Sequence, residues 1–415
     1  MAGPGTARSA YRRPVTVQAS PVAGRLHRGD GGYRRLSVAM FVSGAAIFAV
    51  LYGPQAVLPQ LSAAFGVTPA DAALSMSVAT AALALAVIPV SALSERWGRV
   101  RIMMVSVAAL VVLGLLVPFS PTYPALLALR ALQGIAIAGL PAVSLAYLAD
   151  EVEPGSLGGA VGTLIAGHSL GGLAGRMVTG VVADLGGWRM GLGAVALLAL
   201  GCGVTFALLL PAQRHFRPAG ISARGLLATV AGHLADPALR RLYVTAFALM
   251  GAFVTLYNFL GFRLLQPPFS LTPAVAGLVF LAYLGGTVSS AAAGRLADRY
   301  GRGRVLAAAV ALAVTGALAT VPDSLVAVLL GVLALTVGFF GAHAVASGWV
   351  GLLAQTHRAQ ASGLYLFAYY AGSSAAGWTG GLVYERAGWP VMVGYLTVLF
   401  TVALAPVLRF RRSVS

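Results

Sequence analysis

Long apolar runs separated by short polar segments fill almost the whole of the 415-residue chain. Twelve of these runs carry few charges, and each is close to the roughly 20 residues that a helix needs to cross the hydrocarbon core of a membrane. Because lipid offers no hydrogen-bonding partners, unbroken runs of this kind predict α-helices. We place them near residues 37–58, 72–93, 102–119, 124–149, 157–183, 190–210, 242–262, 273–293, 305–321, 325–353, 360–383 and 389–408.

The polar segments divide the chain into two halves of six runs each, residues 37–210 and 242–408. Residues 1–36 are rich in Arg, Gly and Pro and lack an apolar core, which predicts a disordered basic tail rather than a cleaved signal peptide. Residues 409–415 form a second basic tail. The linker, residues 211–241, contains GLLATVAGHLADPALRRL, which is either an amphipathic helix on the inner leaflet or a solvated tether.

The two halves repeat one another. The stretch GRLADRYGRGRV, residues 294–305, has an altered copy, SALSERWGRVR, at residues 91–101, and the offset of 203 aligns Asp298 with Glu95 and Gly301 with Gly98. Residues 162–188 likewise match residues 363–389 at an offset of 201. With six spans per half the copies share one orientation, so an axis along the membrane normal relates them. Parallel repeats of this kind are typical of transporters with a central substrate site between the halves.

Charge is scarce and unevenly placed. Hydrophobic residues make up 59% of the chain and charged residues 9%, against about 25% charged residues in soluble domains, which excludes an ordinary soluble enzyme. All 28 basic residues are arginine. Of these, 23 fall in the tails and loops that the predicted spans place on the same side of the membrane as the N-terminus. This asymmetry predicts that both termini are cytoplasmic. The net charge of +17 is spread over many loops, which argues against a nucleic-acid-binding stripe.

Several of these stretches resemble one known family. The repeated turn is similar to the loop signature G-x-L-A-D-R-x-G-R of the major facilitator superfamily, and residues 130–134, Arg-Ala-Leu-Gln-Gly, resemble its Arg-x-x-Gln-Gly motif. The glycine-rich run from Gly167 to Gly175 resembles the antiporter motif of drug efflux members. LYGPQAVLPQLS, GAFVTLYNFLGFRLLQPPFSLT and GFFGAHAVASGWVG look like the twelve-span bacterial drug or arabinose efflux subgroup.

The resemblance implies an all-α membrane protein with the major facilitator fold, built from two parallel-related six-helix bundles. It also implies a multi-pass protein of the bacterial inner membrane that exports a small drug-like or sugar-like compound by alternating access, in exchange for protons. We expect the two repeated turns to act in gating, although their arginines also set topology. The gating residues we expect are Glu95, Arg96, Gly98, Arg99, Gly294, Asp298, Arg299, Gly301 and Arg302.

Two arginines lie inside predicted spans, Arg130 and Arg176. A charged residue at the centre of a membrane helix costs about 2.5–3.5 kcal/mol on insertion scales, so it marks a functional site by default. Both fall in the N-terminal half at a similar depth, which predicts one shared polar site. The structural alternatives are that Arg130 binds backbone carbonyls and Gln55, and that Arg176 extends towards the surface.

All eleven carboxylates fall in loops or at span ends, so no buried acid is available to carry protons. His168 and His343 lie near the midplane and are candidates for that role, although a lone membrane histidine also serves as a hydrogen-bonding residue. An apolar pocket with a few polar groups suits a small amphiphilic ligand. Its expected contacts are Tyr52, Gln55, Arg130, His168, Arg176, Tyr257, Asn258, His343, Tyr369 and Tyr370.

Other functions remain as alternatives. Two buried arginines without a buried acid favour an organic-anion transporter, and a membrane sensor or scaffold is the alternative outside transport. No Ser/His/Asp set or metal-ligand spacing appears at membrane depth, so we expect neither an enzyme nor a metal or cofactor. The single Cys202 predicts no disulfide framework. The expected partners are a small-molecule substrate, membrane lipids and protons, and we expect a monomer.

Overall fold

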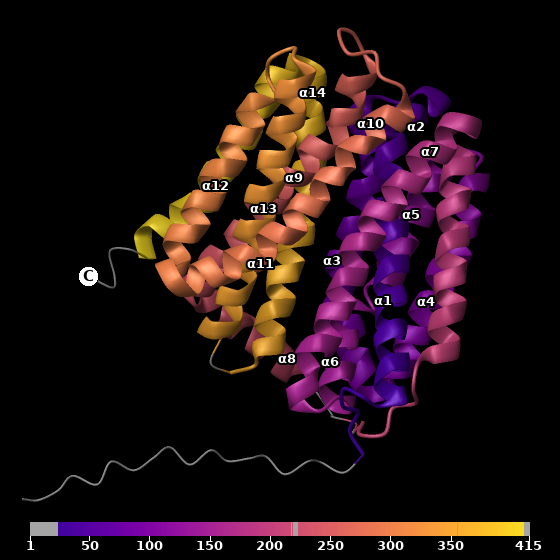
Figure 1. Ribbon diagram of the computed structural model, residues 1–415, viewed down its shortest axis with the longest axis vertical. Helices are drawn as coiled ribbons and strands as arrows, with labels where there is room; N and C mark the ends of the chain where they lie inside the picture. Colours follow the sequence, from indigo (N-terminus) through magenta and orange to yellow (C-terminus); the bar gives the residue numbers. More distant parts are fainter. Residues whose placement is uncertain (1–23, 217, 219–222, 355, 411–415) are drawn as a thin grey trace, which may run out of the picture.

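The computed structural model describes residues 24–216, 218, 223–354 and 356–410, and these residues are almost entirely helical (Figure 1). An isolated β-bridge pairs Leu26 with Val152. The helical elements in chain order are α1 (Gly31–Tyr52), η1 (Gly53–Val57), α2 (Leu58–Phe65), α3 (Pro69–Trp97), α4 (Arg99–Leu116), η2 (Val117–Phe119), α5 (Tyr123–Ile137), α6 (Pro141–Glu151), α7 (Pro154–Leu209), α8 (Ala223–Ala235), α9 (Pro237–Leu265), α10 (Pro273–Gly277), η3 (Leu278–Leu281), α11 (Ala282–Tyr300), α12 (Arg302–Ala319), α13 (Leu325–Leu353) and α14 (Arg358–Phe410).

Within the described part of the chain, 9 helical stretches are long and apolar enough to cross a membrane. Two of them, α7 and α14, each contain two of the predicted spans. A further predicted span is divided between α5 and α6, which are individually shorter. Together these helices account for all the predicted spans, and the all-α membrane fold is confirmed.

The double helices α7 and α14 turn back at equivalent glycines. Gly187 has φ 79° and ψ 173°, and Gly388, at the offset of 201, has φ 75° and ψ −176°. Residues other than glycine rarely adopt this backbone conformation, so each glycine allows the helix to turn back without a longer loop. The residue that follows, Trp188 or Trp389, is buried in both halves. The repeat seen in the sequence is therefore a repeat of backbone geometry.

The helices gather into two bundles, α1–α7 and α9–α14 (Figure 1). Contacts between the bundles run from α3 to α14, from α7 to α10 and η3, and from η1 and α2 to α9. We call the end of the molecule that carries the Gly98 and Gly301 turns the turn end, and the end that carries residues 66–68 and 266–272 the far end. In Figure 1 the far end is at the top and α6 and α8 mark the turn end.

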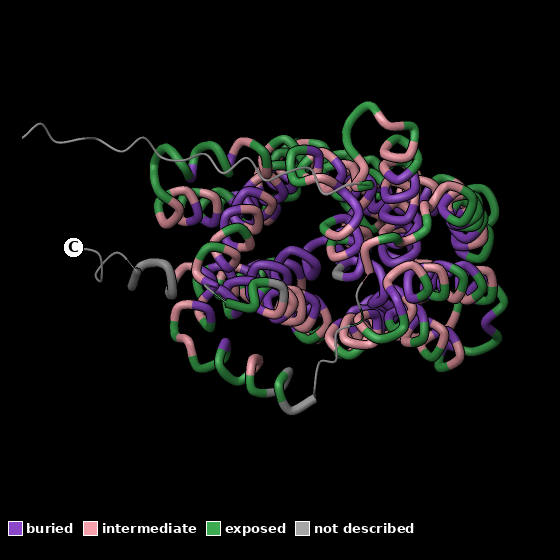
Figure 2. Tube along the Cα trace, turned by 90° about the horizontal axis from the view of Figure 1, so that it is seen from below, coloured by how far each residue is buried: buried purple, intermediate pink, exposed green. Residues whose placement is uncertain are grey.

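Large apolar side chains cover the outside of the protein. Figure 2 shows buried residues in the interior and exposed ones around the rim. Leu185, Phe119 and Leu85 are 82%, 79% and 71% exposed. Such a surface is unusual for a soluble monomer, and it fits a protein surrounded by lipid.

Glycines let the helices of each bundle pack backbone to backbone. A Cβ added at Gly171 of α7 would lie 2.4 Å from the Cα of Ala45 on α1. At Gly372, the equivalent position of α14, an added Cβ would lie 2.1 Å from the carbonyl oxygen of Phe247 on α9. In a membrane, where no hydrophobic effect drives helices together, small residues at such contacts are the main source of close packing.

We expect Gly171→Ala and Gly372→Ala each to lower the melting temperature of the purified protein in detergent. The added methyl group meets backbone that cannot move aside, and overpacking of this kind costs about 1–3 kcal/mol. Gly162→Ala and Gly363→Ala are matched controls, because they occupy equivalent positions of the same two helices and have open space around the added atom. Equal melting temperatures for all four variants would contradict this packing.

Some expected boundaries differ from the helices. Helix α1 begins at Gly31, inside the segment expected to be a disordered tail, and Leu26 already hydrogen-bonds to the backbone of Glu151 and Glu153. The disordered tail is therefore wrong for residues 24–36, because the backbone of this segment pairs with the bundle. Part of the linker is helical, since α8 occupies Ala223–Ala235 and α9 already begins at Pro237. Residues 1–23 and 411–415 of the two predicted tails lie outside the described residues.

Candidate functional site

Arg176 lies on the first half of α7, is 1% exposed and is surrounded by neutral groups. Its Nε donates to the side-chain oxygen of Gln55 at 2.7 Å, one terminal nitrogen to the Gly172 carbonyl at 2.7 Å, and the other to the Tyr283 hydroxyl at 2.9 Å. The guanidinium carbon also lies 4.4 Å from the ring centroid of Tyr52 and 4.5 Å from that of Tyr283. We call these residues, with Phe280 at 5.1 Å, the Arg176 box.

The Arg176 box joins the two bundles. Tyr283 and Phe280 come from the C-terminal bundle, whereas Arg176 and Gln55 come from the N-terminal one. Gln55 continues the connection, because its amide nitrogen donates to the Asn258 side chain of α9 at 2.7 Å. No carboxylate among the described residues pairs with or accepts a hydrogen bond from Arg176. The box therefore holds a buried positive charge that is hydrogen-bonded but not neutralised.

Arg130, on α5, is bound in a different way. Its Nε donates to the Ser75 carbonyl at 2.9 Å, and its terminal nitrogens donate to the carbonyls of Val50 at 3.1 Å and Leu51 at 2.7 Å and to the Gln133 side chain at 2.7 Å. Pro54 has no N–H to give the Val50 carbonyl, which is why α1 ends there and η1 begins. Arg130 thus satisfies backbone groups that this break leaves free.

The expectation of one shared arginine site is therefore corrected. Among the described hydrogen bonds Arg130 and Arg176 have no partner in common, and Gln55 binds Arg176 rather than Arg130. Arg130 binds backbone carbonyls, as its structural alternative expected. The two arginines are still connected through the chain, because the helix break that Arg130 holds is the break that turns Gln55 towards Arg176. The side chain of Arg176 is buried and hydrogen-bonded, and it does not extend to the surface.

A row of aromatic rings runs through the C-terminal bundle from the Arg176 box. Tyr257 donates to or accepts from the Thr336 hydroxyl at 2.7 Å and lies 5.2 Å from Tyr283, measured between ring centroids. Phe253 stacks on Phe339 at 3.8 Å. The row ends at His343, whose Nδ1 lies 3.0 Å from the Tyr365 hydroxyl. The ring of Tyr369 is 4.8 Å from His343 and meets Tyr370 edge-on at 5.2 Å.

His168 stands apart from this row. Its ring stacks on Phe48 of α1 at 4.4 Å, and its Nε2 is buried without a described hydrogen-bond partner. It lies two turns before Arg176 on α7, on the turn-end side, and Gly44 of α1 makes room for it. His168 therefore lies on the same helix as Arg176 but outside the Arg176 box.

The two repeated turns have the same backbone and different partners. Gly98 has φ 94° and ψ 140°, and Gly301 has φ 88° and ψ 138°. At the N-terminal turn Arg99 contacts Asp150 at 2.8 Å and Glu95 at 3.4 Å. Burial raises the pKa of Asp150 and the Arg99 guanidinium opposes this shift. At the C-terminal turn Asp298 is 74% exposed on its side chain and pairs with Arg302 at 3.2 Å.

The other predicted gating residues lie on the surface of these turns. Arg96 is exposed in the last turn of α3, Arg299 lies over the Tyr300 ring at 5.1 Å, and Gly294 has open space around it. The altered, N-terminal copy of the signature is thus the more firmly held of the two, since Gln213 of the linker also accepts from the Val100 N–H at 3.1 Å.

Sequence reasoning missed the residues that complete these contacts. Tyr283 and Phe280 form one side of the Arg176 box, and nothing in their local sequence distinguishes them from packing residues. Glu151 was counted only as a loop acid, yet its carboxylate accepts from the backbone of Arg214 at 2.7 Å and His215 at 2.8 Å. The cluster of three acids at the end of an apolar helix, Asp150, Glu151 and Glu153, was the available signal, and Glu151 marks where the linker is attached.

Comparison with known proteins decides the family. The model of the Major Facilitator Superfamily matches residues 36–266 and again residues 242–415. The chain belongs to the Major Facilitator Superfamily. The double match agrees with the repeat, because each matched region covers one half in full, with an overlap at residues 242–266.

Relatives of this superfamily member are named as transporters. It is 41% identical to the MFS-type transporter YybF of Bacillus subtilis over 91% of this chain and 94% of that protein. It is 38% identical to the inner membrane transport protein YnfM of Escherichia coli over 93% of both chains. The protein is therefore a multi-pass membrane transporter of this superfamily.

Solved structures share the fold at low identity. A bacterial homolog of the human lysosomal transporter Spinster, in an inward-facing and unoccupied conformation, has a TM-score of 0.72 at 15% identity, covering 91% of this chain and 95% of that one. The human organic anion transporter MFSD10 has a TM-score of 0.69 at 19% identity, covering 90% and 99%.

Proposed function

We propose that the protein exports a small amphiphilic organic anion across the bacterial inner membrane by alternating access, driven by protons. The observation that carries the proposal is the Arg176 box, a buried positive charge without a carboxylate partner, placed where the two bundles meet. A buried unpaired charge is costly, so a ligand that supplies the opposite charge gains the energy of neutralising it. The surrounding rings suit an apolar or aromatic body.

The arrangement of the bundles supports alternating access. Hydrogen bonds join them at Gln55 and Asn258, at Arg176 and Tyr283, and at Ala70 and Glu385, and none of these three lies at the turn end. The conformation is thus held together from the centre towards the far end. The arginine distribution favours a cytoplasmic turn end, and the Spinster homolog of similar fold was solved inward-facing.

The export direction and the proton gradient come from the resemblance to efflux members. The competing substrate classes are neutral sugars and cationic drugs. The described site suits them less well than an anion, because the one charge in the Arg176 box is positive: it repels a cation and has no charge to pair with on a neutral sugar. The aromatic row from Tyr257 to His343, with Tyr369 beside its end, provides a continuous aromatic wall that the C-terminal bundle contributes.

Binding of matched ligands tests the substrate class. We expect 2-naphthoate to raise the melting temperature of the purified protein and the isosteric 2-naphthamide to have little effect, since the two differ in the charge that Arg176 recognises. The same pair is then compared for efflux from proteoliposomes with and without an imposed pH gradient. Stabilisation by a cationic dye such as ethidium, with none by any carboxylate, would contradict an anion site.

A further inference from the structure

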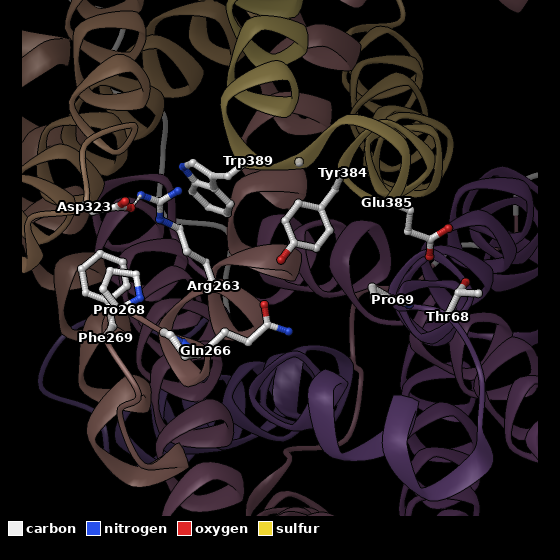
Figure 3. Close-up of a pocket in the computed structure, with 12 residues that line it drawn as sticks. Thr68, Pro69, Arg263, Gln266, Pro268, Phe269, Asp323, Tyr384, Glu385 and Trp389 are labelled. Carbon is white, nitrogen blue, oxygen red and sulfur yellow. Dashed lines mark hydrogen bonds and ion pairs between the residues drawn. The ribbon is translucent and has the colours of Figure 1, made fainter.

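Glu385 lies at the far end, where α14 turns back, and its carboxylate binds the other bundle. Its Oε1 accepts a hydrogen bond from the backbone N–H of Ala70, at the start of α3, at 2.5 Å. The side chain is accessible to solvent, and Figure 3 shows it directed towards Thr68 and Pro69. The contact links the C-terminal bundle to the N-terminal one.

The start of α3 is built so that one N–H remains for this carboxylate. Pro69 has no N–H, and the N–H of Asp71 is taken by the Thr68 side chain at 3.1 Å. The N–H of Ala70 points to Glu385. The first N–H groups of a helix have no partner within the helix, and the positive end of the helix dipole favours an ionised acid over a neutral one.

The contact breaks if the bundles part at the far end. Around it α3 and α14 are in close contact, since a Cβ added at Gly381 would lie 2.8 Å from the Cα of Ala70. Among the described carboxylates, Glu385 is the one that hydrogen-bonds across the two bundles. It is therefore a titratable group whose bonding partner changes with the conformation of the carrier.

We infer that Glu385 is a proton-binding site that controls opening of the far end. The ionised carboxylate holds α3 and the far end closed. When a proton from the solution at that end binds to the carboxylate, the negative charge is lost, the hydrogen bond to Ala70 weakens and the open state gains population. The inference rests on the proposed function for its link to transport, and it supplies a proton-accepting group to a carrier whose described spans hold no carboxylate away from their ends.

Other charged groups face Glu385 and contribute to its field. Asp71 lies in the first turn of α3, Arg386 is the next residue of α14, and Arg263 of α9 and Asp323 lie across a pocket of about 580 Å³ (Figure 3). Tyr384 and Gln266 line the same pocket. Arg263 and Asp323 pair with each other at 3.1 Å within the C-terminal bundle, so their contact persists whether the far end is open or closed.

Distance measurements between the bundles test the inference. Spin labels are placed at Phe119→Cys and Val326→Cys, which are 79% and 67% exposed at the far ends of the two bundles, in a Cys202→Ala background. We expect a longer distance to gain population as the pH falls from 7 to 3.5, the range in which glutamate carboxylates ordinarily take up a proton. The ratio of long to short distances should rise about two- to fivefold, the range for loss of one charge at a helix N-terminus. In Glu385→Gln the long distance should be prominent at both pH values and nearly independent of pH.

Asp184→Asn is the matched control, because Asp184 occupies the equivalent position of α7 and makes no described hydrogen bond or ion pair. It should follow the wild-type pH series. A pH-independent distance in the otherwise native protein, or a Glu385→Gln variant that keeps the full pH response, would overturn the inference. Neither result bears on naphthoate binding, so failure of the proton site is distinguishable from failure of the proposed function.

Discussion

Replacement of Arg176 by methionine is expected to abolish naphthoate binding and its efflux from proteoliposomes. Removing one member of a buried, hydrogen-bonded charge pair costs about 2–5 kcal/mol, which corresponds to a loss of affinity of at least about 30-fold. Any fall in the melting temperature of the ligand-free variant should be smaller than that of Arg130→Met, because removal of a buried charge that has no acid partner offsets the loss of its hydrogen bonds. Arg176→Lys, which keeps the charge but loses part of the contact set to Gln55, Gly172 and Tyr283, should bind with intermediate affinity.

Arg189→Met is the control for that experiment. Arg189 lies on the same helix, is exposed at the far end and stacks on the buried Trp188 at 4.3 Å. Its loss removes a positive charge from the protein without touching the Arg176 box. If Arg176→Met binds naphthoate as well as Arg189→Met does, the anion site is not where we place it.

Replacement of Arg130 by methionine has the opposite signature. We expect a large loss of folded protein, measured by melting temperature and by monodispersity in gel filtration. The variant leaves the carbonyls of Val50 and Leu51 without their side-chain partner inside the bundle, and a buried polar group without a partner costs about 1–3 kcal/mol. An Arg130→Met protein that melts like the wild type but no longer transports would show that Arg130 acts on the substrate instead.

The bundles and their turns were predictable because their signals are local. A run of apolar residues predicts a membrane helix without reference to the rest of the chain. The sequence repeat, at offsets of 201 and 203, pairs Gly187 with Gly388 and Gly98 with Gly301, and each pair has the same backbone conformation. Each of these glycines adopts a positive φ in the structure, a conformation that glycine allows. The structure agrees at these positions because backbone conformation there depends on a few adjacent residues.

The partners of the buried arginines were not predictable in the same way. Which face of a span meets the other bundle depends on how η1 breaks the first span at Pro54, and that break is stabilised by Arg130 from a helix some 80 residues away. The two arginines looked alike in the sequence, yet one binds carbonyls within its bundle and the other reaches Tyr283 across the interface. Composition and spacing do not report such facing.

Under the proposed function, the lone charge of Arg176 also makes the carrier sensitive to voltage. One elementary charge that crosses the full membrane potential changes energy by about 2.3 kcal/mol per 100 mV, and any reorientation of the empty protein moves this charge through part of that field. A monovalent anion seated on Arg176 cancels it, so the loaded protein reorients with little electrical work. The electric field across the membrane therefore acts mainly on the return of the unloaded carrier.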